Sequence, residues 1–107
     1  MAIASLAQKK HPKKDLELAR QIVINGLAEH PAKVFLFGSR ATGRAARTSD
    51  IDIAILPEAP LPDGVLTDIR EQLEESSIIY TVDLVDLSSA EKTLRERVLK
   101  EGIEWSV

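Results

Sequence analysis

Three aspartates, Asp50, Asp52 and Asp83, lie within stretches of otherwise aliphatic and β-branched residues. Burying an unpaired charge costs several kcal/mol, so a stretch that only had to pack would carry Thr or Val at these positions. Asp50 and Asp52 alternate with Ile51 and Ile53. On a β-strand both carboxylates therefore leave the same face, about 6.5 Å apart at the backbone. The spacing predicts that these carboxylates converge on a positively charged ligand.

Asp83 belongs to a later apolar stretch with the same alternation, and it completes a set of three carboxylates if its strand lies beside the first. Hard oxygen ligands without His or Cys nearby suit Mg²⁺ or Mn²⁺ rather than zinc. Such ions keep coordination positions open for phosphate oxygens, and paired ions can activate a hydroxyl and stabilise a leaving pyrophosphate. A solvated sheet face would also carry Asp-x-Asp, so on the carboxylates alone that alternative stays open.

A glycine–serine pair, Gly38 and Ser39, ends the apolar stretch that precedes these aspartates. Glycine lets backbone N–H groups approach a phosphate, so the pair predicts a phosphate-binding turn, with ordinary turn formation as the alternative. Gly38 and Gly43 also have the spacing of a P-loop, but Arg44 and Ala45 stand where that motif requires Lys and Ser or Thr. The P-loop is therefore excluded.

Three arginines follow the turn, Arg40, Arg44 and Arg47, and each could reach a triphosphate or be solvated at the surface. Arg40 also stands where the dinucleotide-binding fingerprint needs its second glycine, which excludes that motif.

Hydrophobic periodicity predicts seven segments in one domain over residues 1–107. In chain order they are a helix over 12–29, a strand over 33–37, a connection over 40–49, a strand over 50–56, a helix from 65 to about 76, a strand over 78–87 and a final helix. A capping box at 88–91 is expected to open the final helix and Gly102 to end it. Leu94, Val98 and Leu99 are expected to face inward from that helix. The order predicts an α/β (α+β) fold, a small mixed sheet flanked by helices.

Asp86 falls on the opposite face from Asp83, so we assign it to a strand end or helix cap. Trp105 is expected to be a core or interface plug.

Composition narrows the function further. The chain has 107 residues, a formal charge of −3 and 4% aromatic residues, which gives little support for a nucleic-acid groove. It has no cysteine, which excludes disulfides and Cys-based zinc sites. No apolar run reaches membrane-spanning length and no targeting segment is evident, so we expect a cytoplasmic protein without a membrane partner. A homo-oligomer remains open.

The string GSRATGRAARTSDIDIAI, followed by YTVDLVDL, resembles the minimal nucleotidyltransferase (MNT) family of the DNA polymerase β superfamily. That family's motif is Gly-Ser, a gap of roughly ten residues, Asp-x-Asp and a later Asp on a strand. The resemblance covers a motif-bearing core at about 33–87, and every motif position is filled. It implies the polymerase β-like nucleotidyltransferase fold, with Asp50, Asp52 and Asp83 as the catalytic and metal-binding residues and Gly38, Ser39 and Arg40 at the nucleotide phosphates.

The resemblance also implies a reaction and a partner. Members of this family are often encoded beside a helical HEPN-domain protein as the antitoxin of a toxin–antitoxin pair. Some transfer AMP from ATP, with Mg²⁺, onto a tyrosine of that toxin. We therefore expect a nucleotidyltransferase that uses a nucleoside triphosphate. Two alternatives remain, namely a binding module that neutralises a helical partner by occlusion without catalysis, and a nucleotide sensor that binds without turnover.

Overall fold

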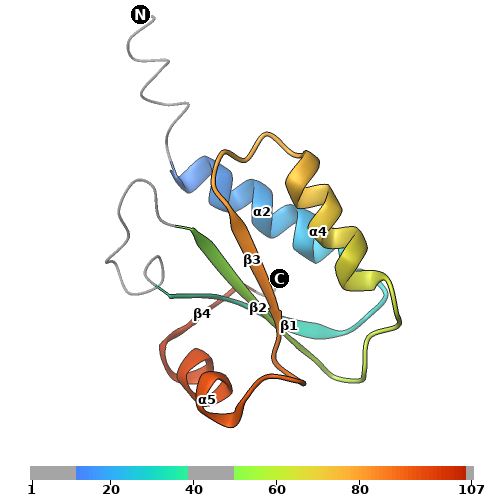
Figure 1. Ribbon diagram of the computed structural model, residues 1–107, viewed down its shortest axis with the longest axis vertical. Coiled ribbons are helices and arrows are strands. Elements are labelled where there is room, and N and C mark those ends of the chain that lie inside the picture. The colour runs from blue at the N-terminus through green and yellow to red at the C-terminus, as the bar shows by residue number, and fades with distance from the viewer. Residues whose placement is uncertain (1–11, 39–49, 106–107) are drawn as a thin grey trace, which may run out of the picture.

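The computed structural model describes residues 12–38 and 50–105, which form a small mixed sheet with helices on both faces (Figure 1). The elements in chain order are α2 (Pro12–Gly26), β1 (Ala32–Phe37), β2 (Ile51–Pro57), α4 (Val65–Glu75), β3 (Val82–Asp86), α5 (Lys92–Glu101) and β4 (Ile103–Glu104). The predicted fold class is confirmed. The connection predicted at 40–49 lies outside the described residues.

The strands are ordered β3-β2-β1-β4 across the sheet. β1 runs antiparallel to both β2 and β4, whereas β2 and β3 are parallel. Parallel strands need a crossover connection, and α4 supplies it between β2 and β3. As a result the end of β1 and the starts of β2 and β3 meet at one end of the sheet.

Alternate residues of β2 pack on opposite faces of the sheet. Ile51, Ile53 and Ile55 are 0% exposed and belong to the cluster beneath α2 and α4, which confirms the prediction that the isoleucines face a core. Ala54, on the other face, is also fully buried, together with Val98 of α5. In Figure 1, α2 and α4 lie on one side of the sheet and α5 on the other.

A glycine allows α2 to pack closely on α4, and a buried acid joins α2 to the segment between α4 and β3. A Cβ atom on Gly26 would collide with Cγ1 of Ile69, so the absence of a side chain allows the two helices to approach closely. Asp15, in the first turn of α2, is 8% exposed, and its Oδ2 accepts a hydrogen bond of 3.3 Å from the backbone N–H of Ile79. Nothing in the local sequence pattern predicts this hydrogen bond of Asp15.

The third strand is shorter than the predicted 78–87. It comprises Val82–Asp86, and its first pairing partner is Ile51 at the start of β2. The residues before it make other bonds: the N–H of Ile78 donates to Ser76 Oγ, and that of Ile79 donates to Asp15. The β-branched residues before Val82 therefore lie outside the strand, because β2 begins at Ile51 and has no residue to pair with them.

The predicted capping box at 88–91 is wrong. Helix α5 begins at Lys92 with Glu91 as its N-cap and no side-chain capping bond. Ser88 instead donates to Asp86 Oδ1 from both its N–H, at 2.8 Å, and its hydroxyl, at 2.6 Å. The assignment of Asp86 to a strand end is thereby confirmed.

The inward face of α5 was also predicted only in part. Val98 is fully buried and Leu94 packs against the same cluster, but Leu99 is 49% exposed, since the helix presents 94 and 98 to the sheet and turns 99 outward. Gly102 ends the helix as predicted, with its N–H donating to Val98 O at 2.7 Å.

The chain then pairs as β4, a two-residue strand that the sequence did not reveal. After it, Trp105 donates from its backbone N–H to Val34 O at 2.6 Å, accepts from Arg20 Nε at its carbonyl oxygen at 3.3 Å, and packs against the core, which confirms its role as a plug.

Candidate active site

Strand register places Phe37, Asp52 and Asp83 in one row across β1, β2 and β3. Residues in such a row project from the same face of the sheet. The neighbouring row packs under α5 and consists of Phe35, Ala54 and Val85. The row that carries the aspartates is therefore next to the covered one, at the end of the sheet where β1 stops.

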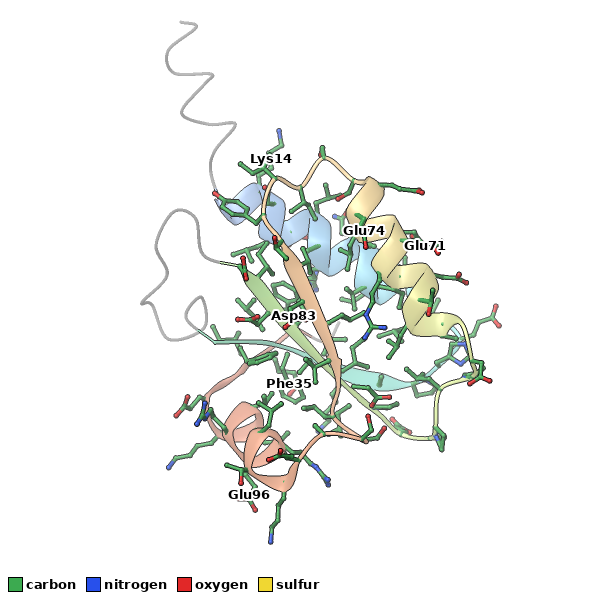
Figure 2. The ribbon with its side chains drawn as sticks, viewed as in Figure 1. Lys14, Phe35, Glu71, Glu74, Asp83 and Glu96 are labelled. Carbon is green, nitrogen blue, oxygen red and sulfur yellow. The ribbon has the colours of Figure 1, made fainter. Side chains whose placement is uncertain are left out.

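Asp52 and Asp83 are direct partners on adjacent parallel strands. Neighbouring strands lie about 4.8 Å apart, so the two carboxylates leave the sheet side by side. Asp52 is half-buried and Asp83 is exposed on β3 (Figure 2). Two like charges in directly opposed positions are unfavourable unless a cation neutralises them.

Gly38, directly after β1, supports the Asp52 carboxylate. Its φ of +77° is in the left-handed region that side chains disfavour. A Cβ atom there would also collide with Oδ2 of Asp52, so the carboxylate lies against the glycine backbone. Backbone conformation and available space independently require glycine at this position. The turn predicted from the Gly-Ser pair thus starts beside one of the aspartates.

The remaining predicted site residues are not fixed by the described chain. Asp50 lies immediately before β2 with an exposed side chain, whereas Ser39 and Arg40 lie outside the described residues, as do Arg44 and Arg47. Among residues 12–38 and 50–105, no three Asp, Glu, His or Cys side chains form a ready group for a metal ion. The three-carboxylate set of Asp50, Asp52 and Asp83, and phosphate binding by Gly38, Ser39 and Arg40, therefore stay predictions.

The donor set nevertheless suits a hard divalent cation. Asp52 and Asp83 offer carboxylate oxygens from one face, and Asp50 is two residues upstream of Asp52. Carboxylate ligands with open positions for water and phosphate are typical of Mg²⁺ sites. Because Asp50 and Asp83 are exposed, their side chains can turn toward an ion without disrupting the core.

A cavity of about 440 Å³ opens beside Asp83, between α4 and β3. Arg70, Leu73, Glu74, Ile78, Tyr80 and Val82 contribute to its lining. The sequence does not predict this cavity, because the cavity depends on how α4 packs along the edge of the sheet. Hydrophobic periodicity indicates only that α4 is amphipathic.

Within the part of the chain that the structure describes, no helix is both long and apolar enough to cross a membrane.

Comparison with known proteins agrees with this architecture. The family described as "Polymerase beta, Nucleotidyltransferase" matches residues 21–104. The chain is 31% identical over 98 residues to the "Probable protein adenylyltransferase MntA" of Haemophilus influenzae, covering 92% of this chain and 84% of that protein. It is 39% identical over 69 residues to the protein adenylyltransferase MntA of Shewanella oneidensis, covering 64% of this chain but only 49% of that protein.

Solved structures show the same relationship. A toxin–antitoxin with AMP-PNP superposes with a TM-score of 0.64 at 32% identity, over 81% of this chain and 72% of that one. A tri-AMPylated Shewanella oneidensis HEPN toxin in complex with its MNT antitoxin gives 0.58 at 29% identity, over 84% and 71%. With its mixed sheet, its Gly38 turn and a family match over most of its length, the chain belongs to the polymerase beta nucleotidyltransferase family.

Proposed function

We propose that this chain is a Mg²⁺-dependent protein adenylyltransferase that transfers AMP from ATP to a hydroxyl, a tyrosine of a HEPN-domain toxin, and so acts as its antitoxin. The observation that carries the proposal is the register pairing of Asp52 with Asp83 beside the Gly38 turn. The similarity to protein adenylyltransferases indicates that the transferred group is AMP. The similarity to the MNT antitoxin in complex with an AMPylated HEPN toxin indicates that the acceptor is a HEPN-domain protein. A cytoplasmic location belongs to the same proposal.

The position of each residue in the sheet assigns it a role toward the nucleotide, the metal ion or the acceptor. The Gly38 backbone would approach the triphosphate, together with Ser39 and Arg40, which follow it in the sequence, and Gly38 leaves room for the Asp52 carboxylate against its backbone. Asp83, exposed on an edge strand of the described sheet, faces the incoming acceptor. Asp50, Asp52 and Asp83 would hold Mg²⁺, which supplies positive charge to the phosphates and lowers the pKa of the attacking hydroxyl.

In the reaction, the acceptor oxygen forms a bond to the α-phosphorus while the bond between that phosphorus and the pyrophosphate breaks. The hydroxyl proton passes to water or to a neighbouring carboxylate. The chain contributes orientation and electrostatic stabilisation of the developing charge, and only a minor part of the catalysis requires proton transfer by a side chain.

The test is transfer of label from [α-³²P]ATP, with Mg²⁺ or Mn²⁺, to the HEPN-domain protein that the proposal expects to be encoded beside the chain. We expect labelling, a mass increase on the acceptor equal to AMP, and loss of both with EDTA. Asp52→Asn and Asp83→Asn should abolish transfer, whereas Asp63→Asn, the same charge change at an exposed loop position, should leave it unchanged. Absence of labelling by the folded, unaltered chain contradicts the proposal.

The alternative, occlusion of the HEPN protein without catalysis, predicts a different result. In that case the chain inhibits the HEPN protein by covering it, and inhibition survives Asp52→Asn. If the chain is an enzyme, Asp52→Asn loses inhibition together with AMP transfer. Toxin activity measured with the unaltered chain and with Asp52→Asn separates the two.

A further inference from the structure

β3 is an edge strand of the described sheet, so one side of its backbone faces away from the other strands. The N–H of Ile51 donates to Thr81 O at 2.9 Å, and the N–H of Leu87 donates to Ile55 O at 2.8 Å. Residues 81 and 87 thus direct these backbone groups toward β2. Because backbone groups alternate along a strand, those of residues 82, 84 and 86 point outward.

Two of these outward positions are already covered. Arg70 Nη2 donates to Leu84 O at 3.0 Å, and Ser89 Oγ donates to Asp86 O at 3.3 Å. Covering an edge in this way prevents other strands from pairing with it. Among the described residues, none gives Val82 comparable cover, and Val82 is the neighbour of Asp83. Within residues 12–38 and 50–105, the edge of β3 is therefore closed toward its end and open at its start.

The open part of the edge adjoins the 440 Å³ cavity between α4 and β3. Leu73, Ile78 and Tyr80 supply its apolar lining, and the volume lies in the range of roughly 300–1,000 Å³ typical of ligand pockets. Val82 borders the cavity and packs toward the α4 face, whereas Asp83 projects from the opposite face. An occupant of the edge would therefore reach the cavity on one side and the aspartate pair on the other.

We propose that an extended, basic segment of the acceptor protein docks along β3 at Val82, inserts one side chain into the cavity, and presents the adjacent side chain, the acceptor hydroxyl, beside Asp83. The inference rests on the proposed function and specifies where its acceptor binds. Successive side chains of an added strand point to opposite faces, so one segment can occupy both places.

The charge of this region favours a basic peptide over a nucleotide. Glu74 is an exposed carboxylate at the cavity, Asp83 is an exposed carboxylate on the other face of the same strand, and Glu71 and Glu75 extend the negative surface along α4 (Figure 2 labels Glu71, Glu74 and Asp83). Among the described residues that line the cavity, Arg70 is the one cation, and its Nη2 donates to Leu84 O. A triphosphate would be repelled here, so the nucleotide belongs on the Gly38 side of the aspartate pair.

The first test reverses one charge at the cavity. Glu74→Lys is compared with Glu96→Lys, the same change on the exposed surface of α5, where the side chain is 66% exposed. Steady-state transfer from [α-³²P]ATP to the HEPN-domain protein encoded beside the chain gives KM for each substrate. We expect Glu74→Lys to raise KM for the acceptor protein about fivefold to tenfold and to leave KM for ATP unchanged. Glu96→Lys should change neither.

The second test removes the outward N–H. Val82→Pro deletes a donor that points away from β2, a substitution that edge strands tolerate. We expect KM for the acceptor protein to rise about tenfold with KM for ATP unchanged. Thermal unfolding confirms that the variant is folded, and Glu74→Lys carries the test if it is not.

The outcomes separate this inference from the proposed function. If the unaltered chain transfers AMP and both variants keep its KM for the acceptor protein, the docking site is wrong while the function stands. If KM for ATP rises instead, the cavity holds the nucleotide and the inference is overturned. If the unaltered chain transfers no AMP, the proposed function is wrong, and the Kd for the HEPN-domain protein is compared between Glu74→Lys and Glu96→Lys instead. Weaker binding by Glu74→Lys, with unchanged binding by Glu96→Lys, supports docking at this edge. Equal binding by the two variants overturns it.

Discussion

Replacing Gly38 with alanine separates the position's contribution to the site from its contribution to stability. Gly38 has a φ of +77°, and a Cβ there would meet Oδ2 of Asp52. Gly64, at the start of α4, has a φ of +92° and has nothing within 4 Å of where its Cβ would be. Gly64→Ala is thus a matched control that introduces similar backbone strain without the collision.

The structure sets the expected magnitudes. An L-residue in the left-handed region costs about 1–2 kcal/mol, so both variants should lose that much unfolding free energy. For a domain of this size, 1 kcal/mol lowers Tm by about 4–8 °C. The collision at Gly38 involves the end of a side chain, so Asp52 can relieve it by rotating away while the backbone keeps its place. Its carboxylate then leaves the site, and such a displacement costs about 10²-fold in rate.

The assay measures AMP transfer and Tm for both variants, with activity recorded well below either unfolding transition. We expect similar decreases in Tm, full activity for Gly64→Ala and about 10²-fold lower activity for Gly38→Ala. The reasoning is refuted if Gly38→Ala transfers AMP within twofold of Gly64→Ala, because the Asp52 carboxylate would then not need the space that the glycine leaves.

Three further predictions concern stability and are measured by urea denaturation. Asp83→Asn should raise the unfolding free energy by about 0.2–1 kcal/mol without divalent cations, since it removes a like charge directly opposite Asp52, and the gain should shrink at 1 M salt. Gly26→Ala should lower it by about 1–3 kcal/mol by forcing Ile69 out of its place between α2 and α4, whereas Asn25→Ala beside it should have little effect. Asp15→Ala should lower it by about 0.5–1.5 kcal/mol because the N–H of Ile79 loses its acceptor, while Asp63→Ala, at an exposed position, should be neutral.

The sequence predicted well those features that depend on a single element. Alternation in β2 correctly separated the isoleucine face from the aspartate face, because side-chain direction along a strand is a local property. The sequence also correctly predicted that α5 ends at Gly102 and that Trp105 packs against the core. The opposite faces of Asp83 and Asp86 followed from the same alternation, and the strand register confirms them.

Features that depend on pairing between distant segments could not be predicted. The direct partnership of Asp52 with Asp83 is set by the register of two parallel strands joined through α4, which no local pattern encodes. The true length of β3 depends on where β2 begins, and β4 is a two-residue strand that exists only because β1 offers a partner. Ser88 looked like a cap but bonds to Asp86, since a serine hydroxyl can satisfy a turn as readily as a helix.

The two faces of β2 explain how one strand can serve both stability and chemistry. Its isoleucines are fully buried beneath α2 and α4, so this face packs against the larger of the two buried clusters along the whole strand. On the other face α5 covers the row of Ala54 and leaves Asp83, in the next row, exposed. Charge can therefore accumulate at the end of that face without entering the core. It follows that substitutions of Asp83 should change activity far more than folding, whereas substitutions of Ile53 should do the reverse.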